Sequence, residues 1–84
     1  MKVQAAALTL GGHNFVVAVS SQELIASGEG DMAIETLQGS FGGAPVVLLA
    51  QLEDGTPRYY GERELVELLR GVPVEKMPFK EYSL

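Results

Sequence analysis

The sequence predicts an α+β fold: a four-stranded, mainly antiparallel sheet with helices on one face, in the order β-β-α-α-β-β-α. Short apolar runs rich in β-branched residues alternate with glycine-containing turns, which is typical of hairpins. A hairpin-plus-helix unit also occurs twice, from Val3 to about Ser27 and from Val46 to Arg70. The recurrence suggests a ββα pseudo-repeat whose two copies bury one common face.

The first unit contains two predicted strands and two short helices. Strands are expected at 3–10 and 15–19, joined by a turn over 11–14. The second strand is apolar on both faces, which favours a central position in the sheet. Ser20 with Glu23 forms a capping-box pattern for the first helix, and Asp31 is placed to cap a second helix over 32–38.

The second unit has the clearest turn and the most regular helix. A strand over 46–52 leads into Asp54-Gly55, which favours a tight hairpin, and a short strand follows over 58–60. Pro57 lacks a backbone donor, so this returning strand is expected at a sheet edge. The helix predicted over 62–70 has acidic residues in its first turn and Arg70 at its end, which complements the helix dipole.

The domain is assigned to residues 1–72, and residues 73–84 are interpreted as an extended C-terminal tail. Pro73 and Pro78 favour extended backbone there. Met77, Phe79 and Tyr82 make the tail apolar, so we expect it to pack on the core or on a partner. An alternative arrangement pairs the two hairpins across a dimer.

Composition excludes several classes of function. The 84-residue chain has no cysteine, which excludes disulfides, thiolate metal sites and thiol catalysis. Its net charge of −5, with scattered Lys and Arg, argues against nucleic acid as a partner. The sequence lacks a signal-peptide pattern and an apolar run long enough to span a membrane. We therefore expect a soluble cytoplasmic protein with no cofactor.

The sequence carries no catalytic or metal-binding motif. His13 is the single histidine and lies among turn-forming residues. The glycine-rich stretches 28–30 and 39–43 lack the Lys-Ser/Thr and strand–loop–helix context of a phosphate loop. The glutamates lie mostly at helix starts or on polar helix faces, where carboxylates are ordinary. We assign no catalytic residue and no metal ligand.

The predicted partner-binding residues lie on the last strand of the hairpin and on the tail. They are Arg58, Tyr60, Met77, Phe79 and Tyr82. Arg and Tyr are enriched at binding hot spots, and alternation along a strand places Arg58 and Tyr60 on one face.

We therefore expect a small protein-interaction module that forms a homodimer or binds another protein. One alternative is an acidic inhibitor or immunity-type protein that covers a basic partner. A second alternative is a small enzyme whose site forms between subunits, with Glu23 or Glu62 near His13 or Tyr60 of another protomer.

The stretch from Ala44 to Leu69 resembles the C-terminal part of thioredoxin-like proteins. The resemblance rests on Pro45, Asp54-Gly55, Gly61 and the helix 64–69, and it covers under a third of the chain. It implies a strand–turn–strand–helix arrangement there. The redox Cys-x-x-Cys motif is absent and no parallel βαβ crossover is expected in the N-terminal half, so redox activity is not expected and the chain is not assigned to that family.

Overall fold

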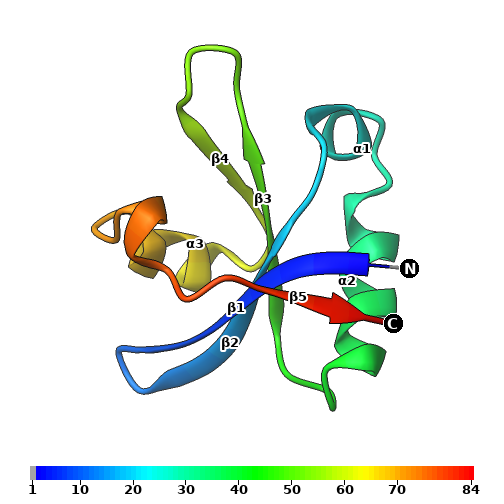
Figure 1. Ribbon diagram of the computed structural model, residues 1–84, viewed down its shortest axis with the longest axis vertical. Coiled ribbons are helices and arrows are strands. Elements are labelled where there is room, and N and C mark those ends of the chain that lie inside the picture. The colour runs from blue at the N-terminus through cyan, green and yellow to red at the C-terminus, as the bar shows by residue number, and fades with distance from the viewer. Residues whose placement is uncertain (1) are drawn as a thin grey trace.

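The computed structural model describes residues 2–84 and has an α+β architecture built on a five-stranded mixed sheet (Figure 1). In chain order its elements are β1 (Lys2–Leu10), β2 (His13–Val19), α1 (Gln22–Ala26), α2 (Gly30–Ser40), β3 (Val46–Gln51), β4 (Pro57–Tyr60), α3 (Arg63–Leu69), the 3-10 helix η1 (Val74–Lys76) and β5 (Lys80–Ser83). The predicted order β-β-α-α-β-β-α therefore accounts for all elements before η1.

The strands lie in the order β4-β3-β2-β1-β5. Antiparallel pairing joins β1 to β2, β3 to β4 and β1 to β5, while β2 and β3 are parallel. The strand with two apolar faces, β2, occupies the centre, and β4 with its Pro57 lies at an edge. Both positions agree with the prediction.

The sheet has a fifth strand that the sequence analysis did not predict. Residues 80–83 pair with the N-terminal half of β1, so that Val3 lies opposite Tyr82 and Ala5 opposite Lys80. The two termini consequently lie close together at one end of the molecule (Figure 1). The four-strand prediction was wrong because the short, charged stretch Lys80–Ser83 has no strand pattern of its own and pairs only where β1 presents an edge.

The helices lie on both faces of the sheet, which corrects the prediction of one covered face. Figure 1 shows α1 and α2 on one side and α3 on the other. Alternate side chains of the central strands enter two separate cores. Val16, Ala18 and Leu48 pack beneath α1 and α2, on what we call the α2 face. Phe15, Val17 and Leu49 pack beneath α3 and η1, on the α3 face.

A parallel crossover connects the two halves of the chain. The connection from β2 to β3 runs through α1 and α2, and Val16 lies opposite Val46 in the parallel ladder. The expectation that the N-terminal half lacks such a crossover was wrong. The ββα order does recur, but α1 and α3 lie on opposite faces, so the two units do not bury one common face.

The helix starts differ slightly from the capping patterns. Ser21 rather than Ser20 caps α1, and its Oγ accepts a hydrogen bond from the backbone N–H of Leu24 at 3.1 Å. Helix α2 begins at Gly30, one residue before the predicted cap Asp31. Across residues 2–84, the helices are all too short or too polar to cross a membrane.

Candidate functional site

An apolar groove opens on the α2 face, where the C-terminal end of β2 meets α1 and α2. Its volume is about 510 Å³, within the range of about 300–1,000 Å³ that is usual for ligand-binding clefts. We call this the α2 groove; it is lined by Val3, Val19, Ser20, Ser21, Leu24, Glu29, Met32, Ala33, Thr36, Leu37 and Leu48. Leu37 and Leu48 are buried and belong to the core, so the floor of the groove is continuous with the core.

The groove exists because the crossover from β2 turns twice within a few residues. Ser20 donates its backbone N–H to the carbonyl of Leu49 at 2.8 Å, which holds the end of β2 against β3. The capped helix α1 then extends for five residues only. Gly28 has a φ of +86°, a conformation that favours glycine and lets the chain reverse into α2. The two helices therefore meet at an angle beyond the end of the sheet.

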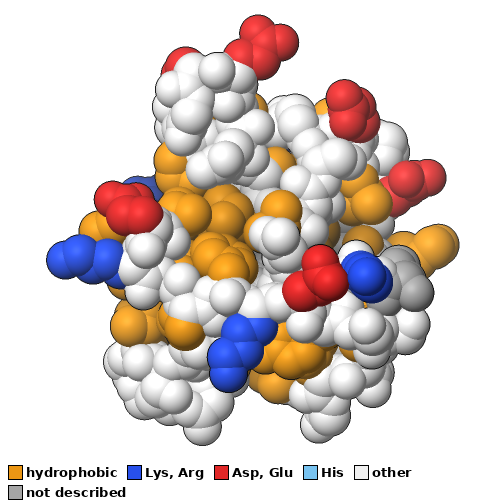
Figure 2. All heavy atoms as spheres, in the orientation of Figure 1, with side chains coloured by type: hydrophobic (Ala, Val, Ile, Leu, Met, Phe, Trp, Pro, Cys, Tyr) orange, Lys and Arg blue, Asp and Glu red, His pale blue; other side chains and the backbone are white. Residues whose placement is uncertain are grey.

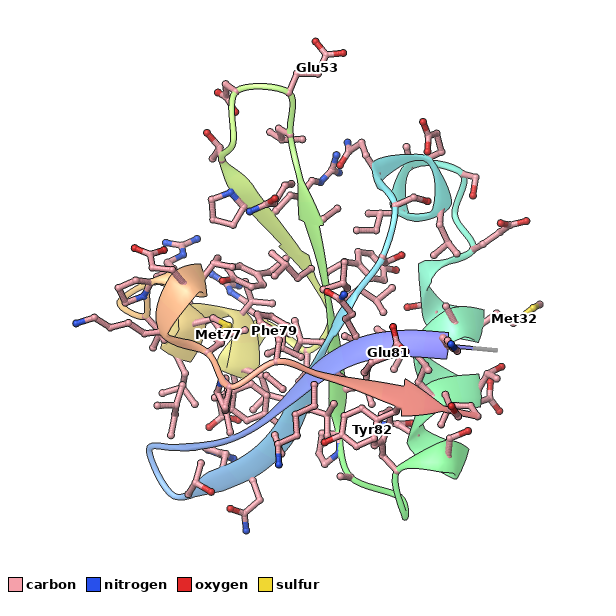
Figure 3. All side chains as sticks on the ribbon, in the orientation of Figure 1. Met32, Glu53, Met77, Phe79, Glu81 and Tyr82 are labelled. Carbon is pink, nitrogen blue, oxygen red and sulfur yellow. The ribbon has the colours of Figure 1, made fainter. Side chains whose placement is uncertain are left out.

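Two large apolar side chains of the groove are exposed to solvent. Met32 is 71% exposed and Val19 is 46% exposed. Figure 3 shows Met32 pointing away from the body of the protein, and in Figure 2 the rim of the molecule at this side carries a protruding hydrophobic side chain. Leu52 and Leu84 are the other exposed large hydrophobic residues within 2–84, and neither lines the groove. Exposed apolar surface that adjoins a groove is typical of an interaction site.

A second, smaller hollow lies on the α3 face at the same end of β2. It has a volume of about 390 Å³ and is lined by Val19, Ser20, Leu49, Val74 and Phe79 together with Gln4 and Gln51. Val19 and Ser20 line both hollows, so apolar surface continues around the end of β2. Figure 2 shows a hydrophobic patch below the β3–β4 hairpin on the visible face.

Tyr60, a predicted partner-binding residue, holds α2 against the sheet. Its hydroxyl donates a hydrogen bond to Oδ1 of Asp31 at 2.8 Å. Its ring packs on Gly30 so closely that a Cβ on that glycine would lie 2.6 Å from Tyr60 Cε2. The hydrogen bond to Asp31, followed by burial and the negative charge of Asp31, raises the pKa of Tyr60 above its ordinary value of 10.0. Tyr60 therefore stabilises the packing of α2 on the sheet.

The other predicted partner-binding residues are divided between core and surface. Arg58 is exposed on the edge strand β4, opposite Ala50. Met77 is only 6% exposed and lies in the core of the α3 face, where Phe79 packs beside it (Figure 3). Tyr82 packs edge-on against Phe41 of the α2 face, with ring centroids 5.1 Å apart. The structure thus separates these residues onto two faces and does not bring them together.

The residues considered for catalysis contact other side chains. His13 Nε2 lies 3.2 Å from Oε1 of Glu64, which links the β2 start to α3. Glu23 belongs to α1 on the other face, and Tyr60 is engaged with Asp31. Within residues 2–84 no group of three potential metal ligands occurs. Within one chain, His13 therefore faces Glu64 and Tyr60 faces Asp31, so neither forms the pair with Glu23 or Glu62 that the sequence analysis considered.

The sequence analysis did not identify the groove, although Met32 offered a signal. The predicted apolar stripe of α2 consists of Ile34, Leu37 and Phe41, and Met32 does not lie at helical spacing from them. A large apolar residue off the stripe of an amphipathic helix is expected in solvent.

Comparison with known proteins finds no matching family model, no matching curated protein and no matching solved structure.

Proposed function

We propose that the protein is a small protein-interaction module and that the α2 groove is its binding surface. The observation that carries this proposal is the exposure of Met32 and Val19 beside a groove whose floor is core. Fully burying a Val or Met side chain that starts fully exposed is favourable by about 1.5–3 kcal/mol. Met32, 71% exposed, therefore offers more than Val19, 46% exposed. The groove therefore replaces Arg58, Tyr60 and the tail as the proposed contact region.

Self-association is one form that this function can take. A second copy that covers Met32 and Val19 makes a homodimer, the assembly that we expected from the sequence through the apolar tail. A second candidate function is an inhibitor-type protein that covers a basic partner. The clustering of acidic residues on α1 and α2 favours this candidate, because opposite charge steers association.

The test compares two variants that each remove exposed apolar surface. Val19→Ser combined with Met32→Ser alters the groove, and Leu52→Ser is the matched control, since Leu52 is 37% exposed and lies outside the groove. Met32→Ser should change the free energy of unfolding by no more than about 0.5 kcal/mol, whereas Val19→Ser and Leu52→Ser, at half-buried positions, should each lower it by about 1 kcal/mol. Thermal unfolding checks that both variants remain folded.

Binding is then measured in two ways. Affinity capture from cell lysate with quantitative mass spectrometry detects other proteins, and sedimentation velocity detects self-association. We expect the wild type and Leu52→Ser to retain a stoichiometric partner or a dimer that the groove variant loses. A groove variant that captures and self-associates as the wild type does would refute the proposal.

A further inference from the structure

Charge is distributed unevenly over the molecule. No Lys or Arg occurs between Lys2 and Arg58, whereas Glu23, Glu29, Asp31 and Glu35 all lie on or beside α1 and α2. From Pro57 onward, five basic residues are matched by five acidic residues. The net negative charge is therefore concentrated on α1 and α2, which border the α2 groove, and on Glu53 and Asp54 of the β3–β4 turn.

Ion pairs follow the same division. The intrachain pairs among residues 2–84 join Lys2 to Glu81, Arg70 to Glu67 and His13 to Glu64. Within that range, no ion pair involves the carboxylates of α1 and α2. Glu29 lines the groove itself, and Asp31 precedes the exposed Met32. An apolar floor thus lies beside carboxylates that no basic side chain of the described chain neutralises.

We propose that the α2 groove binds a short amphipathic segment of a partner protein that carries Lys or Arg beside its apolar residues. This inference rests on the proposed function and adds the chemistry of the partner. Apolar side chains of the segment fill the groove against Leu24, Met32 and Leu37, and its basic side chains reach Glu29 and its neighbours at the rim. Grooves that take amphipathic segments read apolar anchors in this way.

A second copy of this chain is the less suitable occupant on charge. Five of its six basic residues follow Pro57, where five acidic residues match them in number, and the sixth, Lys2, pairs with Glu81. A second copy therefore offers no strongly positive surface. Two α2 faces brought together would oppose their uncompensated carboxylates, which is unfavourable. Charge complementarity therefore selects a basic segment from a different protein.

The experiment is a selection from a random peptide library displayed on phage, with the immobilised full-length protein as bait. Counter-selection on the Val19→Ser, Met32→Ser variant removes peptides that use neither residue. The single Met32→Ser variant then separates peptides that use the α2 groove from those that use the α3-face hollow, which Val19 also lines. We expect the remaining peptides to combine large apolar residues with a clear excess of Lys and Arg. Groove-dependent peptides that are acidic or uncharged would overturn the inference, and so would the absence of any groove-dependent peptide.

A selected peptide is then titrated by fluorescence polarisation at low and high salt. Glu29→Gln should weaken binding about twofold to fivefold at low salt, the effect of one exposed ion pair, and the loss should shrink at high salt. Glu75→Gln, an exposed acidic residue of η1 away from the groove, is the charge-matched control and should bind as the wild type does. Equal affinities for the wild type and Glu29→Gln at low salt would contradict the assigned rim contact.

The outcomes separate this inference from the proposed function. A groove-dependent dimer in sedimentation, without groove-dependent basic peptides, would overturn the basic-segment inference and leave the groove as an interaction surface. A groove variant that retains every partner and every assembly state would remove both.

Discussion

The two faces of the sheet are completed differently. On the α3 face, the C-terminal residues return over the sheet, bury Met77 and add β5 to the edge of β1. On the α2 face, the crossover helices leave a groove at the end of β2 with Met32 in solvent. Each ion pair of residues 2–84 includes a residue from Pro57 onward, the half that includes α3. Within the same range, the carboxylates of α1 and α2 form no ion pair. This difference is the basis for proposing the α2 face as the binding surface.

Two methionines give the largest contrast between the faces. Met77→Ala should lower the free energy of unfolding by about 2–5 kcal/mol, because it leaves a cavity in the core. Met32→Ala should change it by no more than about 0.5 kcal/mol, because the side chain is exposed. Urea denaturation of both variants measures the contrast. Similar losses at the two positions would show that Met32 also supports the fold.

Two glycines of α2 distinguish close packing from helix propensity. Gly30→Ala should destabilise by about 1–3 kcal/mol, because the new Cβ overlaps the Tyr60 ring. Gly39→Ala should stabilise by about 0.5–1 kcal/mol, because alanine is the better helix former and, among residues 2–84, nothing beyond its chain neighbours and its own helix backbone lies within 4 Å of the added group. Thermal unfolding gives both values. Stabilisation by both substitutions would mean that Tyr60 does not seat on Gly30.

The hydroxyl groups of two neighbouring tyrosines, one on each face of the sheet, test the same difference between the faces. Tyr60→Phe removes the hydrogen bond to Asp31 and should lower the free energy of unfolding. Tyr59 projects to the α3 face, and its buried hydroxyl has no partner among residues 2–84. Tyr59→Phe should therefore be neutral or stabilising. The opposite ranking in urea denaturation would contradict the assignment of the two rings to the two faces.

The same hydrogen bond predicts a small alkaline effect. The pKa of Tyr60 is raised above 10.0, chiefly by its hydrogen bond to Asp31. A raised folded-state pKa stabilises the protein fully below pH 10.0, and this stabilisation is lost as the pH rises through the folded pKa. Burial also raises the pKa of Tyr59, so alkaline pH destabilises the Tyr60→Phe variant as well as the wild type.

The measurement compares the free energies of unfolding of the wild type and Tyr60→Phe at neutral pH and above pH 10.0. The advantage of the wild type should shrink as Tyr60 ionises, while the contribution of Tyr59 cancels in the difference. An advantage that stays constant across this range would exclude the hydrogen bond to Asp31 as its source.

Local patterns predicted the elements better than their arrangement. The apolar run Phe15–Val19 correctly indicated the central strand, and Pro57 correctly indicated an edge. Two apolar faces on a central strand also require two covering layers, but the ββα recurrence favoured one layer instead. Which face each helix covers depends on the crossover between β2 and β3, and the sequence carries no local pattern for that connection.

The tail and the groove were harder to predict because both depend on tertiary contacts. Lys80–Ser83 becomes a strand only against the free edge of β1. Met32 and Val19 come together only when the crossover brings the start of α2 beside the end of β2. Residues that line a groove formed by several elements do not recur at a regular spacing in the sequence. The predicted partner-binding residues were therefore selected by residue type and not by position.

The most direct test of the central claim maps the binding surface by NMR. Backbone amide shifts of the isotope-labelled protein are recorded while the partner captured from lysate, or a selected peptide, is added. The account predicts that the shifts concentrate at 19–24 and 32–37, while the amides of α3 and β5 stay in place. Shifts centred on Arg58 or on residues 77–82, with the groove unchanged, would contradict it.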